Sequence, residues 1–209
     1  MYTEKKYKYP RTPHLPWSEG RSSDDIGLFS LSIFEGKQVI VTEKMDGECT
    51  TMGQSYVHAR SVDSKHHPSR NWVKALQSQV GHQIPEGWRI CGENLYAQHS
   101  IFYPSLPSYF MMFSIWDENN MCLSWEQTLE WAELLELEVP PVLFQGLWDE
   151  KAIQELSFSR ETSEGYVVRS AGSFAYEDFG KNVAKMVRKG HVQTDKHWMH
   201  QSVVPNGLA

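Results

Sequence analysis

The sequence lacks any long apolar run. No uninterrupted apolar segment approaches the ~18 residues that a membrane-spanning helix needs. The N-terminal residues Met1 to Lys6 are followed by further polar residues and Pro10, so the apolar core of a signal peptide is not present there. We therefore expect no membrane partner and a cytoplasmic protein.

Cysteine is also scarce. The three cysteines are far apart, odd in number and form no CxxC pair: Cys49, Cys91 and Cys122. This pattern disfavours a disulfide framework and indicates a reducing compartment. Two histidine pairs, His66–His67 and His197–His200, lack the cysteine or acidic partners that would complete a tetrahedral zinc site. We therefore expect no structural zinc.

Positive charge is in deficit. The chain of 209 residues has 20 Lys and Arg against 26 Asp and Glu, for a net charge of -6. A protein that coats nucleic acid non-specifically is normally basic, because neutralising phosphates supplies its affinity. The composition therefore disfavours a packaging protein, but it allows a catalyst whose Lys and Arg converge in one groove.

Apolar periodicity and turn residues predict the elements. Proline, glycine and polar residues make the first 30 or so residues irregular. Ser124 and Gln127 form a capping box before a helix over 124–136, with Trp125, Leu129, Ala132 and Leu135 at helical spacing. Two further helices are expected, one opened by Ser69 as N-cap with Trp72, Val73, Leu76 and Val80 on its apolar face, and one over 151–158. Strands are expected over 38–42, 50–59, 88–96, 110–116, 165–169 and 182–188. This order, without regular alternation, predicts an α+β domain with largely antiparallel sheets flanked by helices.

The segment Glu43-Lys44-Met45-Asp46-Gly47 follows the first strand. Taken alone, it is compatible with a hairpin turn that carries a solvated lysine. A nucleophilic lysine must instead be neutral near pH 7, far below its usual pKa of about 10.4. Burial, neighbouring cations or a metal could lower the pKa that far. A triphosphate bound beside such a lysine would need arginines, lysines and carboxylates from the rest of the chain.

Five downstream segments supply these groups in order: His58–Ser61, Cys91–Tyr96, Phe113–Asp117, Ser163–Arg169 and Val183–Lys189. Together with the Lys44 segment they resemble the six nucleotidyltransferase motifs of the covalent ligase and capping-enzyme superfamily. More narrowly, they are similar to the RNA ligases related to the nick-sealing phage enzyme. The resemblance spans residues 42–189. It implies one nucleotidyltransferase (ATP-grasp-like covalent ligase) domain over 1–209, and ATP with Mg²⁺ or Mn²⁺ as cofactors.

The resemblance also implies roles for individual residues. Lys44 would attack the α-phosphorus of ATP and hold AMP as a phosphoramidate, with Glu43 beside it in the nucleotide site. Arg60 would contact the nucleotide and the RNA end, since its planar fork suits phosphate or ribose oxygens. Glu93 would bind the ribose or a metal-bound water, and Glu164 would hold the hydrated metal that helps to discharge the Lys44 amine.

Two more residues complete the implied site. Phe113 matches the aromatic side chain that stacks on adenine, although a Phe in the run Met111-Met112-Phe113 is also compatible with a core position. Lys185 matches the lysine that neutralises the α-phosphate as pyrophosphate leaves. The family's second lysine is replaced by Val187, and the next cations are Arg188 and Lys189. Residues two apart share a face of a strand, whereas residues three apart do not. Arg188 stands three residues after Lys185, so it would reach the nucleotide only if a bulge turned its side chain to the same face.

A further departure is Cys49, where the relatives have an asparagine. The run Arg11 to Trp17 is expected to cover the nucleotide pocket or to touch RNA. Only about twenty residues follow Lys189, so no C-terminal duplex-clamping domain is expected. Residues 195–200 could form a short helix that grips RNA.

The implied function is an ATP-dependent RNA ligase that joins an RNA 5′-phosphate to a 3′-hydroxyl, at a duplex nick, as in RNA repair. We expect a monomer that uses its own groove or an accessory protein to hold the duplex. Three alternatives remain open: a capping-type guanylyltransferase, a DNA ligase, and a non-catalytic RNA-end-binding module. Retention of Lys44, Glu93, Glu164 and Lys185 together disfavours the last.

Overall fold

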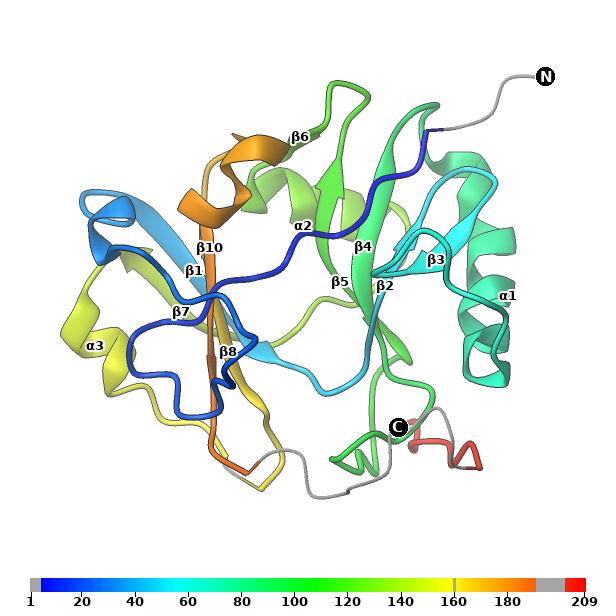
Figure 1. The fold of residues 1–209 in the computed structure, drawn as a ribbon. Coiled ribbons are helices and arrows are strands. Elements are labelled where there is room, and N and C mark those ends of the chain that lie inside the picture. Colours follow the sequence, from blue (N-terminus) through cyan, green and yellow to red (C-terminus); the bar gives the residue numbers. More distant parts are fainter. Residues whose placement is uncertain (1–4, 160, 191–201) are drawn as a thin grey trace.

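The computed structural model describes residues 5–159, 161–190 and 202–209, and it has an α+β fold built on two antiparallel sheets (Figure 1). The first sheet has four strands in the order β10 (Val183–Val187), β8 (Gly165–Ser170), β1 (Gln38–Lys44) and β7 (Val142–Leu147). The predicted fold class is confirmed.

The second sheet has six strands. Their order is β3 (Val57–Ala59), β2 (Glu48–Met52), β4 (Arg89–Asn94), β5 (Phe110–Trp116), β6 (Met121–Cys122) and β9 (Phe174–Ala175). Helices α1 (Asn71–Val80) and α2 (Trp125–Leu134) pack on this sheet through one apolar cluster, whereas α3 (Glu150–Gln154) packs on the four-stranded sheet through Ile153. Four 3₁₀ helices complete the elements: η1 (Leu31–Ile33), η2 (Pro68–Arg70), η3 (Gly81–Gln83) and η4 (Tyr176–Lys181).

The helix predictions were largely confirmed. The capping box of Ser124 and Gln127 opens α2. Leu129, however, is 39% exposed, because the buried face of α2 runs instead through Thr128, whose hydroxyl donates to the Ser124 carbonyl. Ser69 was wrong as the N-cap of α1. A side chain one turn earlier, that of His67, accepts from the Ser69 N–H and opens η2 before α1 begins.

Five of the six predicted strands were found, one was wrong, and three further strands were not predicted. Residues 50–59 form a hairpin of β2 and β3 rather than one strand, because the chain turns at Gly53, whose N–H donates to the Tyr56 carbonyl. The mostly half-exposed β7 and the very short β6 and β9 were not predicted.

The N-terminal segment (residues 5–30) is irregular, as predicted, but it is firmly hydrogen-bonded. The Tyr9 N–H donates to the Arg60 carbonyl beside β3, and the Leu15 N–H donates to the Lys185 carbonyl on β10. In Figure 1 this dark blue segment crosses the molecule from the six-stranded sheet to the four-stranded sheet. It thereby covers the free edge of β10 and one opening between the sheets.

No helix among the described residues is long and apolar enough to span a membrane. The predicted helix over residues 195–200 lies outside the described residues, as does the His197–His200 pair. Residues 202–209 dock on the segment after β4, where the Asn206 side chain donates to the Leu95 carbonyl.

Candidate active site between the two sheets

A cavity of about 440 Å³ lies between the two sheets and the N-terminal segment. This volume is within the range of small-molecule sites. Six residues predicted from the sequence line it: Glu43, Lys44, Arg60, Glu93, Phe113 and Lys185. They come from β1, the end of β3, β4, β5 and β10, so the fold brings together residues as much as 142 positions apart in the chain.

Lys44 is the last residue of β1, and its side chain is mostly buried. Its Nζ donates to Oε2 of Glu164 at 2.7 Å, and Glu164 precedes β8, the strand that pairs with β1. Burial lowers the pKa of Lys44, but the negative charges of Glu164 and Glu93 more than offset this effect and raise the pKa overall. The amine is therefore an ammonium in this arrangement, contrary to the lowered pKa that the sequence led us to expect.

The carboxyl groups around Lys44 are too many for its one amine to balance if all of them are ionised. Burial raises the pKa of Glu93 to about 8, and the negative charges of Glu164 and Asp46 act in the same direction against Lys44. Burial and Glu164 also raise the pKa of Asp46. A site with this excess of buried negative charge favours an added cation.

Asp46 and Gly47 hold the turn between β1 and β2 in place. Oδ2 of Asp46 accepts from the backbone N–H groups of Ser100 at 2.7 Å and Ile101 at 2.8 Å. The Gly47 N–H donates to the Glu93 carboxylate, and a Cβ at Gly47 would lie 2.5 Å from the Asn94 carbonyl oxygen. The KxDG pattern thus fixes the turn, and this anchoring role was not predicted for Asp46.

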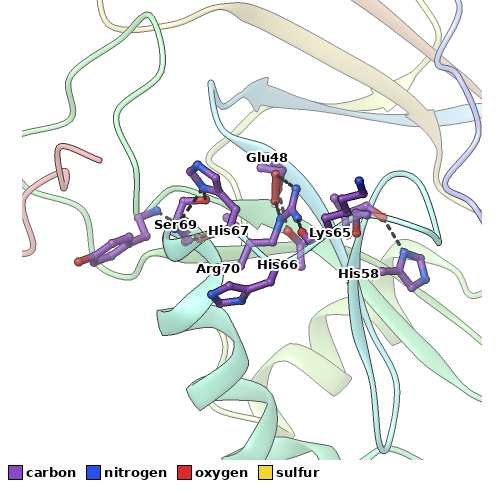
Figure 2. A network of polar contacts seen from close by, with 12 residues as sticks. Glu48, His58, Lys65, His66, His67, Ser69 and Arg70 are labelled. Carbon is purple, nitrogen blue, oxygen red and sulfur yellow. Dashed lines mark hydrogen bonds and ion pairs between the residues drawn. The ribbon is translucent and has the colours of Figure 1, made fainter. Parts of the chain in front are cut away.

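The first residue of β2 is held by a buried ion pair, shown in Figure 2. The guanidinium of Arg70 donates to both carboxylate oxygens of Glu48, at 2.5 and 2.6 Å, and also to the Lys65 carbonyl. This bidentate contact connects the strand that follows the Lys44 turn to η2 and to the loop after Arg60.

Aromatic rings form one wall of the cavity. Phe113 is half-buried and lies edge-on to Tyr9, with ring centroids 5.3 Å apart. Arg169 is buried and donates to the Phe113 carbonyl at 3.2 Å and to the Leu123 carbonyl at 2.8 Å. The Phe113 ring therefore faces the cavity from a fixed backbone. Tyr9 and Arg169 also line the cavity. Arg169 ends one of the predicted motif segments but was given no role, and Tyr9 was not predicted at all.

Lys185 and Arg188 differ in position. Lys185 lines the cavity, where burial and the charge of Lys44 lower its pKa. Arg188 does not line it. Its Nε donates to the Ser163 carbonyl at 2.9 Å, because no bulge re-aims the residue at the end of β10. The structure therefore gives no support to Arg188 as a nucleotide ligand.

Two further residues singled out from the sequence, Glu43 and Cys49, lie at the cavity. Glu43 lines the cavity, and Ser163 donates to its carboxylate, although burial raises its pKa overall. Cys49 also lines the cavity, and burial and the charge of Glu93 raise the pKa of its thiol well above the usual range. A thiol in that state is neutral, so Cys49 contributes shape rather than charge.

The carboxylates near Lys44 fit a divalent cation that is only partly coordinated by protein. Among the described residues, no group of three or more His, Cys, Asp or Glu is arranged to hold a metal ion by itself. Mg²⁺ is usually held by one or two carboxylates together with substrate phosphates and water. Glu164 and Glu93 match this requirement, because both carboxylates lie near Lys44 and influence each other's charge.

Comparison with known proteins agrees with the fold. A family model described as RNA ligase matches residues 37–187. Solved structures of Naegleria gruberi RNA ligase are similar: one with PPi (TM-score 0.51, 16% identity, 78% of this chain, 53% of that chain) and one mutant with ATP and Mn (TM-score 0.53, 16% identity, 78% of this chain, 53% of that chain). A second mutant with ATP and Mn gives a TM-score of 0.54 at 15% identity, over 90% of this chain and 64% of that chain.

The chain spans between about half and just under two thirds of the length of these structures. At this level of identity the likeness shows a common fold. Among curated proteins, no sequence matches the chain.

Proposed function

The chain belongs to the RNA ligase family, and from this premise we propose that it is an ATP-dependent RNA ligase that forms a lysyl-AMP intermediate on Lys44. The observation that carries the proposal is the position of the Lys44 amine: it lies at the wall of a nucleotide-sized cavity, 2.7 Å from Glu164, and Arg60 and Lys185 line the same cavity. We propose that the two sheets act as one adenylating domain, since the cavity lies between them.

In the first step, Nζ of Lys44 attacks the α-phosphorus of ATP. A nitrogen–phosphorus bond forms, the bond to the bridging oxygen breaks, and pyrophosphate leaves with the electron pair. Lys44 starts as an ammonium and ends as a phosphoramidate N–H, so Nζ loses two protons. Oε2 of Glu164, the acceptor 2.7 Å away, takes the proton lost before the attack, and solvent takes the proton lost as the nitrogen–phosphorus bond forms. Lys185 and Arg60 neutralise charge on the phosphates as it moves toward pyrophosphate.

In the second step, an oxygen of the RNA 5′-phosphate attacks the phosphorus of lysyl-AMP, and the nitrogen–phosphorus bond breaks. The amine of Lys44 regains a proton, and AMP is joined to the RNA through a pyrophosphate bond. In the third step, the 3′-hydroxyl attacks the RNA 5′-phosphorus, loses its proton to solvent and displaces AMP. The product is a phosphodiester.

The remaining residues bind and orient. The Phe113 ring would stack on the adenine, which gives flat contact without base selectivity. Glu164 and Glu93 would hold Mg²⁺ or Mn²⁺. When bound, that ion neutralises carboxylate charge near Lys44 and polarises phosphate oxygens.

The first test is covalent labelling. The protein is incubated with Mg²⁺ or Mn²⁺ and α-labelled ATP or GTP, and the label that stays on the denatured protein, resists alkali and is released by acid, as a lysine phosphoramidate should, is measured. We expect label from ATP that disappears in Lys44→Ala and persists in Lys151→Ala, an exposed lysine on α3. Label from GTP instead would favour a capping guanylyltransferase, and no label from either nucleotide would refute both enzymes.

The second test concerns Glu164. In Glu164→Ala the rate of labelling should fall by about 100-fold or more, the range that loss of a proton-transfer or charge-stabilising group produces. Circular dichroism should show an intact fold. Unchanged labelling would refute the role of Glu164. Sealing of a nicked RNA duplex, compared with the same nick in DNA, tests the choice of substrate.

A further inference from the structure

Lysine and tyrosine are interleaved where the N-terminal segment approaches the cavity. The sequence from residue 5 is Lys-Lys-Tyr-Lys-Tyr, in which Lys5, Lys6 and Lys8 are exposed and Tyr7 is half-buried. The last residue of this run, Tyr9, lines the cavity itself. We call Lys5, Lys6, Tyr7 and Lys8 the basic rim. The basic rim, which is followed directly by Tyr9, therefore connects the outer surface of the protein to the wall of the proposed active site.

The backbone of the basic rim is held at several points. The Arg89 guanidinium lies 4.4 Å from the centroid of the Tyr7 ring, and the Tyr176 ring packs beside it at 5.9 Å. The Tyr176 hydroxyl donates to the Lys8 carbonyl at 2.6 Å. One residue on, the Tyr9 N–H donates to the Arg60 carbonyl. These contacts hold the main chain in place, so the lysines project from a preformed surface.

The lysine charges are concentrated and are not used in ion pairs. Lys5 lies 4.8 Å from the Tyr7 ring centroid, and Lys6 lies 5.2 Å from that of Tyr56. Among the ion pairs found between described residues, none involves Lys5, Lys6 or Lys8. In a chain with a net charge of -6, three unpaired cations at one rim require an explanation beyond solubility.

We propose that the basic rim binds the phosphates of the RNA strand that carries the reacting end and directs that end past Arg60 to Lys44. Ordered lysines beside aromatic rings are the chemistry by which proteins follow a nucleic-acid backbone without reading its sequence. The rim leads to Arg60 through Tyr9, because the Tyr9 N–H donates to the Arg60 carbonyl and both residues line the cavity. The proposal rests on the RNA ligase function, because it assigns the substrate path of that site.

The test uses a Lys5→Ala/Lys6→Ala variant and a matched Lys151→Ala/Lys181→Ala control, since all four lysines are exposed and both variants lose two positive charges. Binding of a fluorescently labelled nicked RNA duplex with a 5′-phosphate is measured without ATP, between about 50 and 200 mM salt. We expect affinity about tenfold weaker in the rim variant. We also expect the slope of log affinity against log salt to be smaller by about one for each lysine removed. The control should match the unmodified protein.

Covalent labelling of Lys44 by ATP, in the absence of RNA, is measured in parallel and should be unchanged in both variants. Equal RNA affinity and salt dependence in the rim variant would overturn the proposal, as would an equal loss in the control. The first outcome would leave an acidic protein partner as the occupant of the rim. If the unmodified protein takes no label but the rim variant still loses RNA binding, the ligase function fails and the RNA surface stands.

Discussion

Burial and charge act in opposite directions on Lys44. Burial alone lowers its pKa, but Glu164 at 2.7 Å and Glu93 nearby raise it further than burial lowers it. The same carboxylates that keep the amine protonated are those suited to a divalent cation. A cation bound to these carboxylates would neutralise their charge and remove the effect that raises the pKa of Lys44, so the acidic surroundings are compatible with the nucleophilic role proposed for Lys44.

A second residue, His58, should make the free energy of unfolding depend on pH. The ring is buried and stacks on Tyr56, and its Nδ1 lies 2.6 Å from the Ala59 carbonyl oxygen, which assigns the proton to Nδ1. Its Nε2 is buried without a partner among the described residues. Burial lowers the pKa of His58, and the charges of Lys6 and Arg89 lower it further.

A lowered histidine pKa means that the unfolded chain binds more protons than the native chain just below pH ~6.5. We therefore expect the contribution of His58 to the free energy of unfolding to fall as the pH drops below about 6.5, whereas the raised pKa of Glu93 contributes in the opposite direction. In His58→Gln this fall should be smaller. Urea unfolding at several pH values measures the difference. An identical pH dependence in the two proteins would show that His58 does not contribute to it.

Among the structural elements, the turn between β1 and β2 determines whether Lys44 is placed correctly. A Cβ at Gly47 would lie 2.5 Å from the Asn94 carbonyl oxygen, so the turn or β4 must shift in Gly47→Ala. We expect a loss of about 1–3 kcal/mol in the free energy of unfolding and a large fall in labelling by ATP. Gly172→Ala is the control, because nothing lies within 4 Å of its Cβ position. Equal behaviour of the two variants would contradict the close-approach argument.

The contact between β2 and η2 should carry much of the stability of this region. The Arg70 and Glu48 side chains are only 6% and 10% exposed. Removing one partner leaves a buried charge, so Arg70→Ala should cost about 3–5 kcal/mol. Lys181→Ala breaks the exposed pair with Asp178 and should have no measurable effect. Denaturant unfolding distinguishes them, and a Glu48→Met/Arg70→Met variant that restores stability would show that the unpaired charge is the cause.

The same elements show what sequence can and cannot predict. The capping box of α2 and the apolar run of β5 depend on local patterns, and the sequence predicted both. The prediction joined β2 and β3 into one strand because it missed the four-residue turn that begins at Gly53. The path of Leu15 along β10 depends on backbone pairing between residues 170 positions apart, which no local pattern encodes. A second long-range contact, from the Tyr9 N–H to the Arg60 carbonyl, brings Tyr9 to the cavity, so the motif residues of the site could be predicted from the sequence but its N-terminal wall could not.

The cavity between the sheets makes the whole molecule one binding unit. Lys44 and Lys185 approach it from the four-stranded sheet, and Glu93 and Phe113 approach it from the six-stranded sheet. The N-terminal segment reaches both sheets through the Tyr9 and Leu15 hydrogen bonds. A nucleotide in the cavity would therefore contact all three parts, so its binding should stabilise the domain as a whole.

Thermal unfolding with ATP tests this coupling. A ligand at 100 times its Kd stabilises the native state by about 2.7 kcal/mol, which corresponds to a rise in Tm of roughly 5–11 °C for a chain of this size. We expect this rise in a single transition, measured in Lys44→Ala so that no covalent adduct forms. Lys185→Ala, added to the same background, should reduce the rise at equal ATP concentration because it removes a phosphate contact. Two transitions, of which ATP shifts only one, would show that the two sheets unfold separately and that the nucleotide is held by one of them.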